Sequence, residues 1–175
     1  YISGQSVLKN GKIKNLPIEK IDNSSPIFFF TNTIITGRVA IASEILKQFR
    51  FDTKYRISED TDLWVRISSK YPDIVQIKHH TLIYRIHNLN SVNPKKFNAY
   101  NDRKSTIKEI YQNNKKHLDK KIVSKTINNC YFGIYKYYKS NKYFFKAFCS
   151  MVKAIVKLPN HRLKEKVYLL ITVLK

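Results

Sequence analysis

Glycine and proline are scarce in this sequence, with 4 and 5 copies among 175 residues. Loop-rich all-β proteins use both residues heavily in their turns, so this scarcity favours an architecture that contains helices. The hydrophobic share of 43% is large enough for a packed core and argues against a disordered chain. The length fits one domain, or one domain with an appendage.

Cysteine is equally scarce, and long apolar runs are missing. Cys130 and Cys149 are the only cysteines, and their spacing fits neither a disulfide framework nor a zinc site. That usage is typical of a reducing compartment, so we expect a cytoplasmic protein. The start does not resemble a signal peptide, and no stretch of 18 consecutive apolar residues predicts a membrane-spanning helix.

Acidic residues are few, which leaves a formal net charge of +21. Residues 1–96 carry 15 Lys and Arg against 8 Asp and Glu, a net charge of +7, and residues 97–175 carry the remaining 18 against 4, a net charge of +14. No acidic residue lies between Asp119 and Glu165. Such a field attracts nucleic acid or an anionic membrane face. An AT-rich genome, which favours Lys, Asn, Ile and Tyr codons, would produce the same excess without a function.

Short apolar segments alternate with turns in the first half. The pattern predicts a hairpin over 7–13 around Asn10-Gly11, because this pair suits the positive φ angles of a type I′ turn. Residues 27–33 read as a strand or a buried helix, and 39–41 as a strand after a turn at 36–38. Helices are expected at 43–48, capped by Ser43, and at 58–70, capped by Ser58. Two strands are expected at 74–77 and 81–86.

The second half changes character near Phe97. Residues 97–175 read as helical throughout, with a turn at Ser140-Asn141 and a last helix over 162–174. The predicted organisation is therefore an α/β part over 1–96 followed by an all-α tail over 97–175.

Three acids open the helix expected at 58–70, namely Glu59, Asp60 and Asp62. Helix N-termini stabilise carboxylates, so the cluster has a purely structural explanation. The functional explanation is a general base held rigidly at the edge of a cleft. The Asp-x-Asp at Asp60 to Asp62 is not read as a metal site, because positions i and i+2 of a helix point in different directions.

Three segments in order carry a resemblance to a known family. They are Phe51-Asp52, then Glu59-Asp60-Thr61-Asp62-Leu63-Trp64-Val65-Arg66, then Leu82-Ile83-Tyr84-Arg85-Ile86-His87. Their order and separations resemble the family 2 glycosyltransferases, which have a GT-A fold, over roughly residues 1–95. Arg50 stands where that family usually has a glycine before the Phe.

The resemblance implies roles for individual residues. Asp60 matches the catalytic base that deprotonates the acceptor hydroxyl, and Glu59 would orient it. Trp64 matches an aromatic beneath the acceptor site, although core packing would explain it equally well. Arg66 could face the diphosphate, but its i,i+4 spacing favours an ion pair with Asp62. The resemblance also assigns two further sites, substrate binding to Thr36 and Gly37 and metal binding to His87.

The same resemblance implies partners and a cofactor. The donor would be a nucleotide-sugar and the acceptor a glycan or a lipid-linked glycan, and a divalent metal (Mn²⁺ or Mg²⁺) would assist. In this family an N-terminal half of about a hundred residues binds the nucleotide and most of the metal site. We expect that half to precede Tyr1, so that the chain by itself binds donor poorly.

Aromatic residues and lysines interleave through the tail, as in the stretch from Tyr131 to Phe148. The pattern has three explanations: a helical bundle with tyrosines in its core, docking on an anionic membrane surface, or stacking on nucleic acid. Nucleic acid is the least favoured. The alternative to an enzyme is a non-enzymatic basic helical module that binds nucleic acid or a protein partner.

Overall fold

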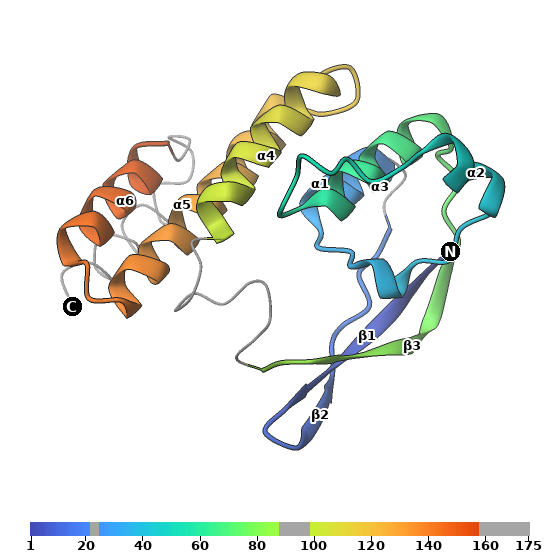
Figure 1. Cartoon of the computed structure of the whole chain (residues 1–175), viewed down its shortest axis with the longest axis horizontal. Coiled ribbons are helices and arrows are strands. Elements are labelled where there is room, and N and C mark those ends of the chain that lie inside the picture. Colours follow the sequence, from blue (N-terminus) through green and yellow to red (C-terminus); the bar gives the residue numbers. More distant parts are fainter. Residues whose placement is uncertain (22–24, 88–98, 158–175) are drawn as a thin grey trace. The chain divides into compact units, whose positions relative to one another are not determined.

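The computed structural model describes residues 1–21, 25–87 and 99–157 (Figure 1). These residues form two compact units, one comprising the described residues up to 87 together with Asn114–Leu118, the other comprising 99–113 and 119–157. The described part is mixed α/β, with one three-stranded sheet and six α-helices. The predicted α/β class is confirmed at that level.

The sheet has the strand order β2-β1-β3. Strands β1 (Ile2–Lys9) and β2 (Lys12–Asn15) are antiparallel, and β3 (Gln76–Arg85) runs parallel to β1. Asn10 and Gly11 connect β1 to β2 with φ angles of 50° and 74°, the left-handed region that Asn and Gly tolerate. The predicted hairpin is confirmed.

Strand β3 is one continuous element, so the prediction of two strands at 74–77 and 81–86 was wrong. The interruption in the sequence is Lys78-His79-His80, whose side chains are exposed while the backbone stays paired with β1 through two register shifts. A Cβ on Gly4 would stand 3.0 Å from the His80 ring, so glycine permits this close approach.

Helices cover the rest of the first unit. The segment at 27–33, for which a strand or a buried helix was expected, forms most of helix α1 (Ser25–Thr31). Helices α2 (Ser43–Gln48) and α3 (Glu59–Lys70) lie close to the predicted ranges. A short 3₁₀ turn, η1 (Thr36–Arg38), forms the expected turn. The strand predicted at 39–41 was wrong, because only a single bridge joins Val39 to Ile2.

The two predicted serine caps are not formed. Ala42 occupies the cap position of α2, and the Ser43 hydroxyl donates to Glu44 instead. Ser58 precedes α3 with φ 66°, and its side chain makes no capping hydrogen bond. A left-handed backbone at that position departs from the extended geometry of a capping residue.

Helices α1 and α3 pack together to form the core of the first unit. Phe30, Leu63 and Val65 are fully buried there, because the apolar stripe of α3 faces the aromatic run of α1. The core therefore holds α3 by its central turns and leaves its first residues, Glu59 and Asp60, only half-buried.

The second unit is a run of three helices, α4 (Ala99–Asn113), α5 (Lys120–Ser140) and α6 (Phe144–Lys157), in which α5 packs against both others. Asp119 caps α5 by accepting a hydrogen bond from the Lys121 amide at 2.5 Å. The turn predicted at Ser140-Asn141 is confirmed. Phe97 and the helix expected at 162–174 lie outside the described residues. No helix in the described ranges is both long and apolar enough to cross a bilayer.

Candidate functional site

The first turn of α3 places its three acids in two different environments. Asp62 is 3% exposed, whereas Glu59 and Asp60 are half-buried. The difference follows from helical geometry, because Asp62 lies on the side of α3 that faces inward. One motif of three carboxylates is thus divided into a buried acid and two that reach the surface.

Asp62 forms an ion pair with Arg66, with 2.8 Å between Oδ2 and Nε. The Arg66 Nη2 also donates to the Arg50 carbonyl at 2.7 Å, which ties α3 to the loop before it. Burial raises the pKa of the Asp62 carboxyl, and the hydrogen bond and charge of Arg66 offset this only in part. Arg66 makes the i,i+4 pair that the sequence predicts, and Asp62 has a structural role.

Asp60 lies at the start of α3 with its carboxylate fixed locally. Its Oδ1 accepts a hydrogen bond from the Thr61 amide at 2.7 Å, and the Thr61 hydroxyl lies 3.4 Å from the same oxygen. A half-exposed carboxylate whose position is set by a backbone donor can approach a hydroxyl group in a neighbouring molecule. A carboxylate of this kind is one of the groups that can serve as a general base.

Trp64 is buried at 4% exposure. Its Nε1 donates to the Ile34 carbonyl at 2.8 Å, and its ring lies 6.3 Å from Phe29 and 6.4 Å from Phe51, centroid to centroid. Phe51, which belongs to the first of the three resembling segments, is 43% exposed. Core packing therefore accounts for Trp64, and the contact with Phe51 connects it to the surface beside α3.

Thr36 and Gly37 are exposed in η1, and His87 is exposed just after β3. A Cβ on Gly37 would stand 3.1 Å from Leu82 of β3, so the turn lies close against the strand that ends near His87. Across the part of the chain that the structure describes, no group of three or more His, Cys, Asp and Glu side chains could hold a metal ion. The described residues thus form no such group around His87.

Sequence reasoning missed an ion pair between the buried Arg38 and the partly exposed Glu19. The Arg38 side chain is 1% exposed, its Nη2 lies 2.6 Å from Glu19 Oε2, and its Nε donates to the Ser3 carbonyl at 2.7 Å. Burial alone would raise the pKa of Glu19, but the hydrogen bonds from Arg38 and from its own backbone amide, with the Arg38 charge, lower it. No periodic signal connects residues 19 apart, so only the fold reveals the pair.

Comparison of the chain with protein-family models, with curated proteins and with solved structures gave no match. A functional assignment therefore depends on the residues themselves. The strongest group is the first turn of α3 with Phe51-Asp52 before it and the end of β3 after it, all within the first unit.

Proposed function

We propose that this chain is the acceptor-side part of a family 2 glycosyltransferase with a GT-A fold. It would serve to transfer a sugar from a nucleotide-sugar to a hydroxyl group of a glycan or lipid-linked acceptor, in the synthesis of cell-surface polysaccharide. The resemblance of the three ordered segments supports this function, and so does the unequal placement of the acids in α3.

The observation that carries the proposal is the contrast between Asp60 and Asp62. If the three acids had only a structural role, stabilisation of the helix start would account for all of them. In α3, Asp62 is buried and paired with Arg66, whereas Asp60 is half-buried and its Oδ1 accepts a hydrogen bond from the Thr61 amide. The acid that matches the family's base is thus one of the two that an acceptor could reach.

The reaction is a direct displacement with inversion. Asp60 accepts the proton of the acceptor hydroxyl while that oxygen attacks the anomeric carbon of the donor. The bond between the anomeric carbon and the diphosphate oxygen breaks, and the nucleoside diphosphate leaves with the electron pair. Glu59, adjacent to Asp60, orients the acceptor or the base. The proposal assigns substrate contacts to Thr36 and Gly37, and an indirect one to Trp64 through Phe51.

A divalent cation, Mn²⁺ or Mg²⁺, belongs to the proposed family's chemistry, in which it neutralises the leaving diphosphate. The described residues do not fit a metal centre by themselves, because they offer no group of three ligands. His87 is a single imidazole donor that suits Mn²⁺. His87 would have an accessory place at such a site.

Replacing the base provides the test. In the protein expressed from its own gene, Asp60→Asn should lower sugar transfer from a panel of nucleotide-sugars by about 10²- to 10⁴-fold, since a general base contributes that factor. Asp73→Asn is the matched control, because Asp73 is an exposed acid in the loop after α3.

The readouts are the transfer rate and the anomeric configuration of the product by NMR, with denaturant unfolding as the check on folding. The control should transfer at the wild-type rate, and the product should be inverted. Near-normal transfer by Asp60→Asn, or no transfer by the wild type with any nucleotide-sugar, would contradict the proposal.

A further inference from the structure

Helix α6 has an apolar side that packs within the second unit. At about 100° per residue, Ala147, Met151 and Ala154 fall on one side of the helix, and all three are buried. Ala147 and Met151 pack with Tyr135 of α5, and Phe132, Tyr138 and Ile155 border this cluster. This side accounts for the contact between α5 and α6 and for the formation of the helix.

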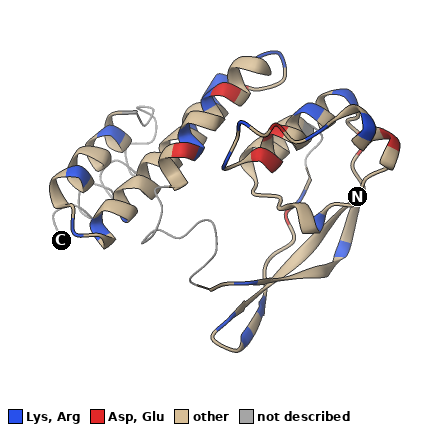
Figure 2. Cartoon of the chain, in the orientation of Figure 1, with Lys and Arg blue, Asp and Glu red and all other residues tan. Residues whose placement is uncertain are grey.

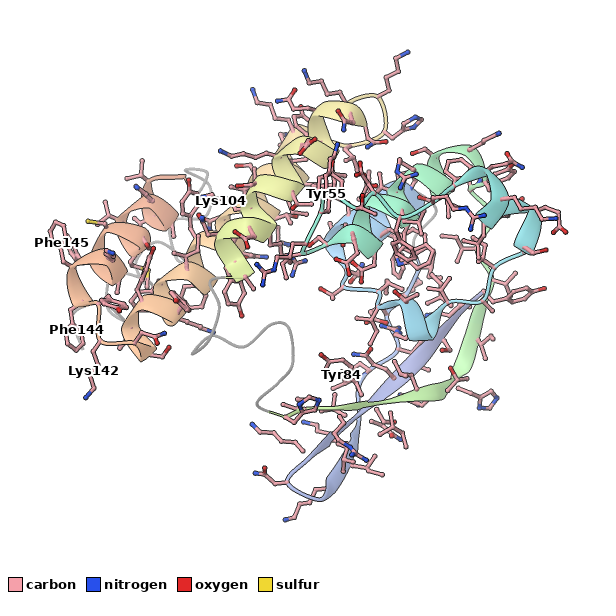
Figure 3. All side chains as sticks on the ribbon, viewed as in Figure 1. Tyr55, Tyr84, Lys104, Lys142, Phe144 and Phe145 are labelled. Atoms are coloured by element: carbon pink, nitrogen blue, oxygen red, sulfur yellow. The ribbon has the colours of Figure 1, made fainter. Side chains whose placement is uncertain are left out.

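A second apolar strip on α6 faces solvent. Its members recur at helical spacing and are strongly exposed: Phe144 (68%), Phe145 (79%), Phe148 (53%), Val152 (40%) and Val156 (72%). Figure 3 shows Phe144 and Phe145 pointing away from the packed helices. Packing among the described helices of this unit does not explain a helix that is apolar on both its packed and its solvent side.

A basic strip borders the exposed apolar one. On the same helical projection Lys146 and Lys153 lie together beside it, and Lys142, with φ 62°, ends the turn just before α6. Between residues 120 and 157 there are nine lysines and no Asp or Glu, and Figure 2 shows blue but no red on α5 and α6. The charged side chains described on α5 and α6 are therefore all cationic.

We propose that the exposed strip of α6 docks on an anionic lipid bilayer. Phe144, Phe145 and Phe148 enter the boundary between headgroups and acyl chains, and the bordering lysines contact lipid phosphates, the arrangement of an interfacial amphipathic helix. Val152 and Val156 favour lipid over nucleic acid, since aliphatic side chains gain from hydrocarbon but cannot stack on bases. This inference goes beyond the proposed sugar transfer and does not depend on it.

The phenylalanines are tested by flotation of the full chain with vesicles of equal parts phosphatidylglycerol and phosphatidylcholine. The triple variant Phe144→Ser, Phe145→Ser, Phe148→Ser should lose at least about 100-fold in binding, because each buried aromatic contributes roughly tenfold. The matched control removes three comparably exposed apolar side chains from the first unit, Ile13→Ser, Val75→Ser and Ile83→Ser. That control should bind as the wild type does.

The lysines are tested in the same assay. Lys142→Gln, Lys146→Gln and Lys153→Gln together should weaken binding by about fivefold for each charge. Lys12→Gln, Lys14→Gln and Lys78→Gln make the same change in net charge on exposed sites of the first unit and should have little effect. If only the variant at Lys142, Lys146 and Lys153 loses vesicle binding, and if that loss depends on salt, the contact with the lipid phosphates lies at α6.

Several results would overturn the proposal. They are the absence of vesicle binding, equal binding to pure phosphatidylcholine vesicles, and equal losses in test and control variants. If the phenylalanine variant instead abolished self-association, or binding to duplex DNA, without any vesicle binding by the wild type, the occupant would be a second copy or a nucleic acid. Far-UV circular dichroism confirms that the exposed substitutions leave the helices folded.

Discussion

Asp62 shows how a single buried carboxylate affects the stability of the first unit. Burial raises its pKa despite the ion pair with Arg66, so the folded protein holds this proton to a higher pH than the unfolded chain does. Between the unfolded pKa of about 3.9 and the raised folded value, the native state binds more protons. The contribution of Asp62 to stability is therefore greatest at low pH and falls as the pH rises through the folded pKa.

Asp62→Asn should remove this dependence. The free energy of unfolding of the variant, minus that of the wild type, should increase as the pH rises from about 3 to 7, by about 1.4 kcal/mol for each unit of pKa difference. Arg66 keeps its hydrogen bond to the Arg50 carbonyl in the variant. Denaturant unfolding at several pH values measures the difference, and a constant or decreasing difference would show that the pair dominates over burial.

Individual residues were predictable where a local rule applies. The Asp62–Arg66 pair follows from i,i+4 spacing, and Asn10-Gly11 from its φ preference. The pair between Glu19 and Arg38 brings together two segments by tertiary folding, and no local rule anticipates it. The Ser43 and Ser58 caps failed because the chain enters α2 one residue earlier than expected and enters α3 through a left-handed residue.

At the scale of elements, α4 and α5 approach each other closely at Gly133. The ring of Tyr100 lies so near that a Cβ on Gly133 would stand 2.2 Å from its Cδ1 and 2.4 Å from its Cγ. Both atoms are near the base of the side chain, so the ring cannot swing aside without moving α4. Glycine in the middle of a helix costs about 1 kcal/mol relative to alanine, and the packing of Tyr100 explains why it is there.

Gly133→Ala should therefore destabilise the second unit by about 1–3 kcal/mol, the usual cost of overpacking, although alanine is the better helix former. Starting from Tyr100→Ala, the same substitution should be neutral or stabilising, because the obstructing ring has gone. Denaturant unfolding of the four proteins measures the coupling. Stabilisation by Gly133→Ala in the wild-type background would refute the close packing.

Elements were predictable where one face repeats with a clear period. Helix α3 followed from its apolar stripe and acidic start, and the helices of the second unit from their long 3.6-residue periodicity. Helix α1 is seven residues long and apolar from Pro26 to Phe30, so its sequence could not distinguish a strand from a helix. Two strands were predicted in place of β3 because exposed polar residues interrupt its pattern, whereas the strand continues past them with register shifts in its pairing with β1.

At the scale of the whole molecule, the net charge of +21 is concentrated where acids are absent. Because exposed charges are screened over about 10 Å at 0.1 M salt and about 3 Å at 1 M, binding to anionic vesicles should fall by more than tenfold over that range. The variant without Phe144, Phe145 and Phe148 should retain only the salt-sensitive part. Flotation at several salt concentrations tests this, and salt-independent binding would exclude an electrostatic contribution.

Composition and periodicity were enough to predict the α/β class and the helical second half. The division of the α3 acids could not be predicted in this way, because it depends on which side of the helix faces the aromatic core contributed by α1. The structure identifies the inward side of α3, because Trp64 and Asp62 are both buried there.

The central claim is that two carboxylates of one helical turn have different tasks, Asp62 in stability and Asp60 in sugar transfer. The most direct measurement compares Asp60→Asn with Asp62→Asn for transfer rate and for unfolding at low and neutral pH. We predict that Asp60→Asn loses transfer by about 10²-fold or more and keeps the wild-type pH dependence of stability, whereas Asp62→Asn keeps transfer and loses that dependence. Loss of transfer in Asp62→Asn alone, or in neither variant, would contradict this account.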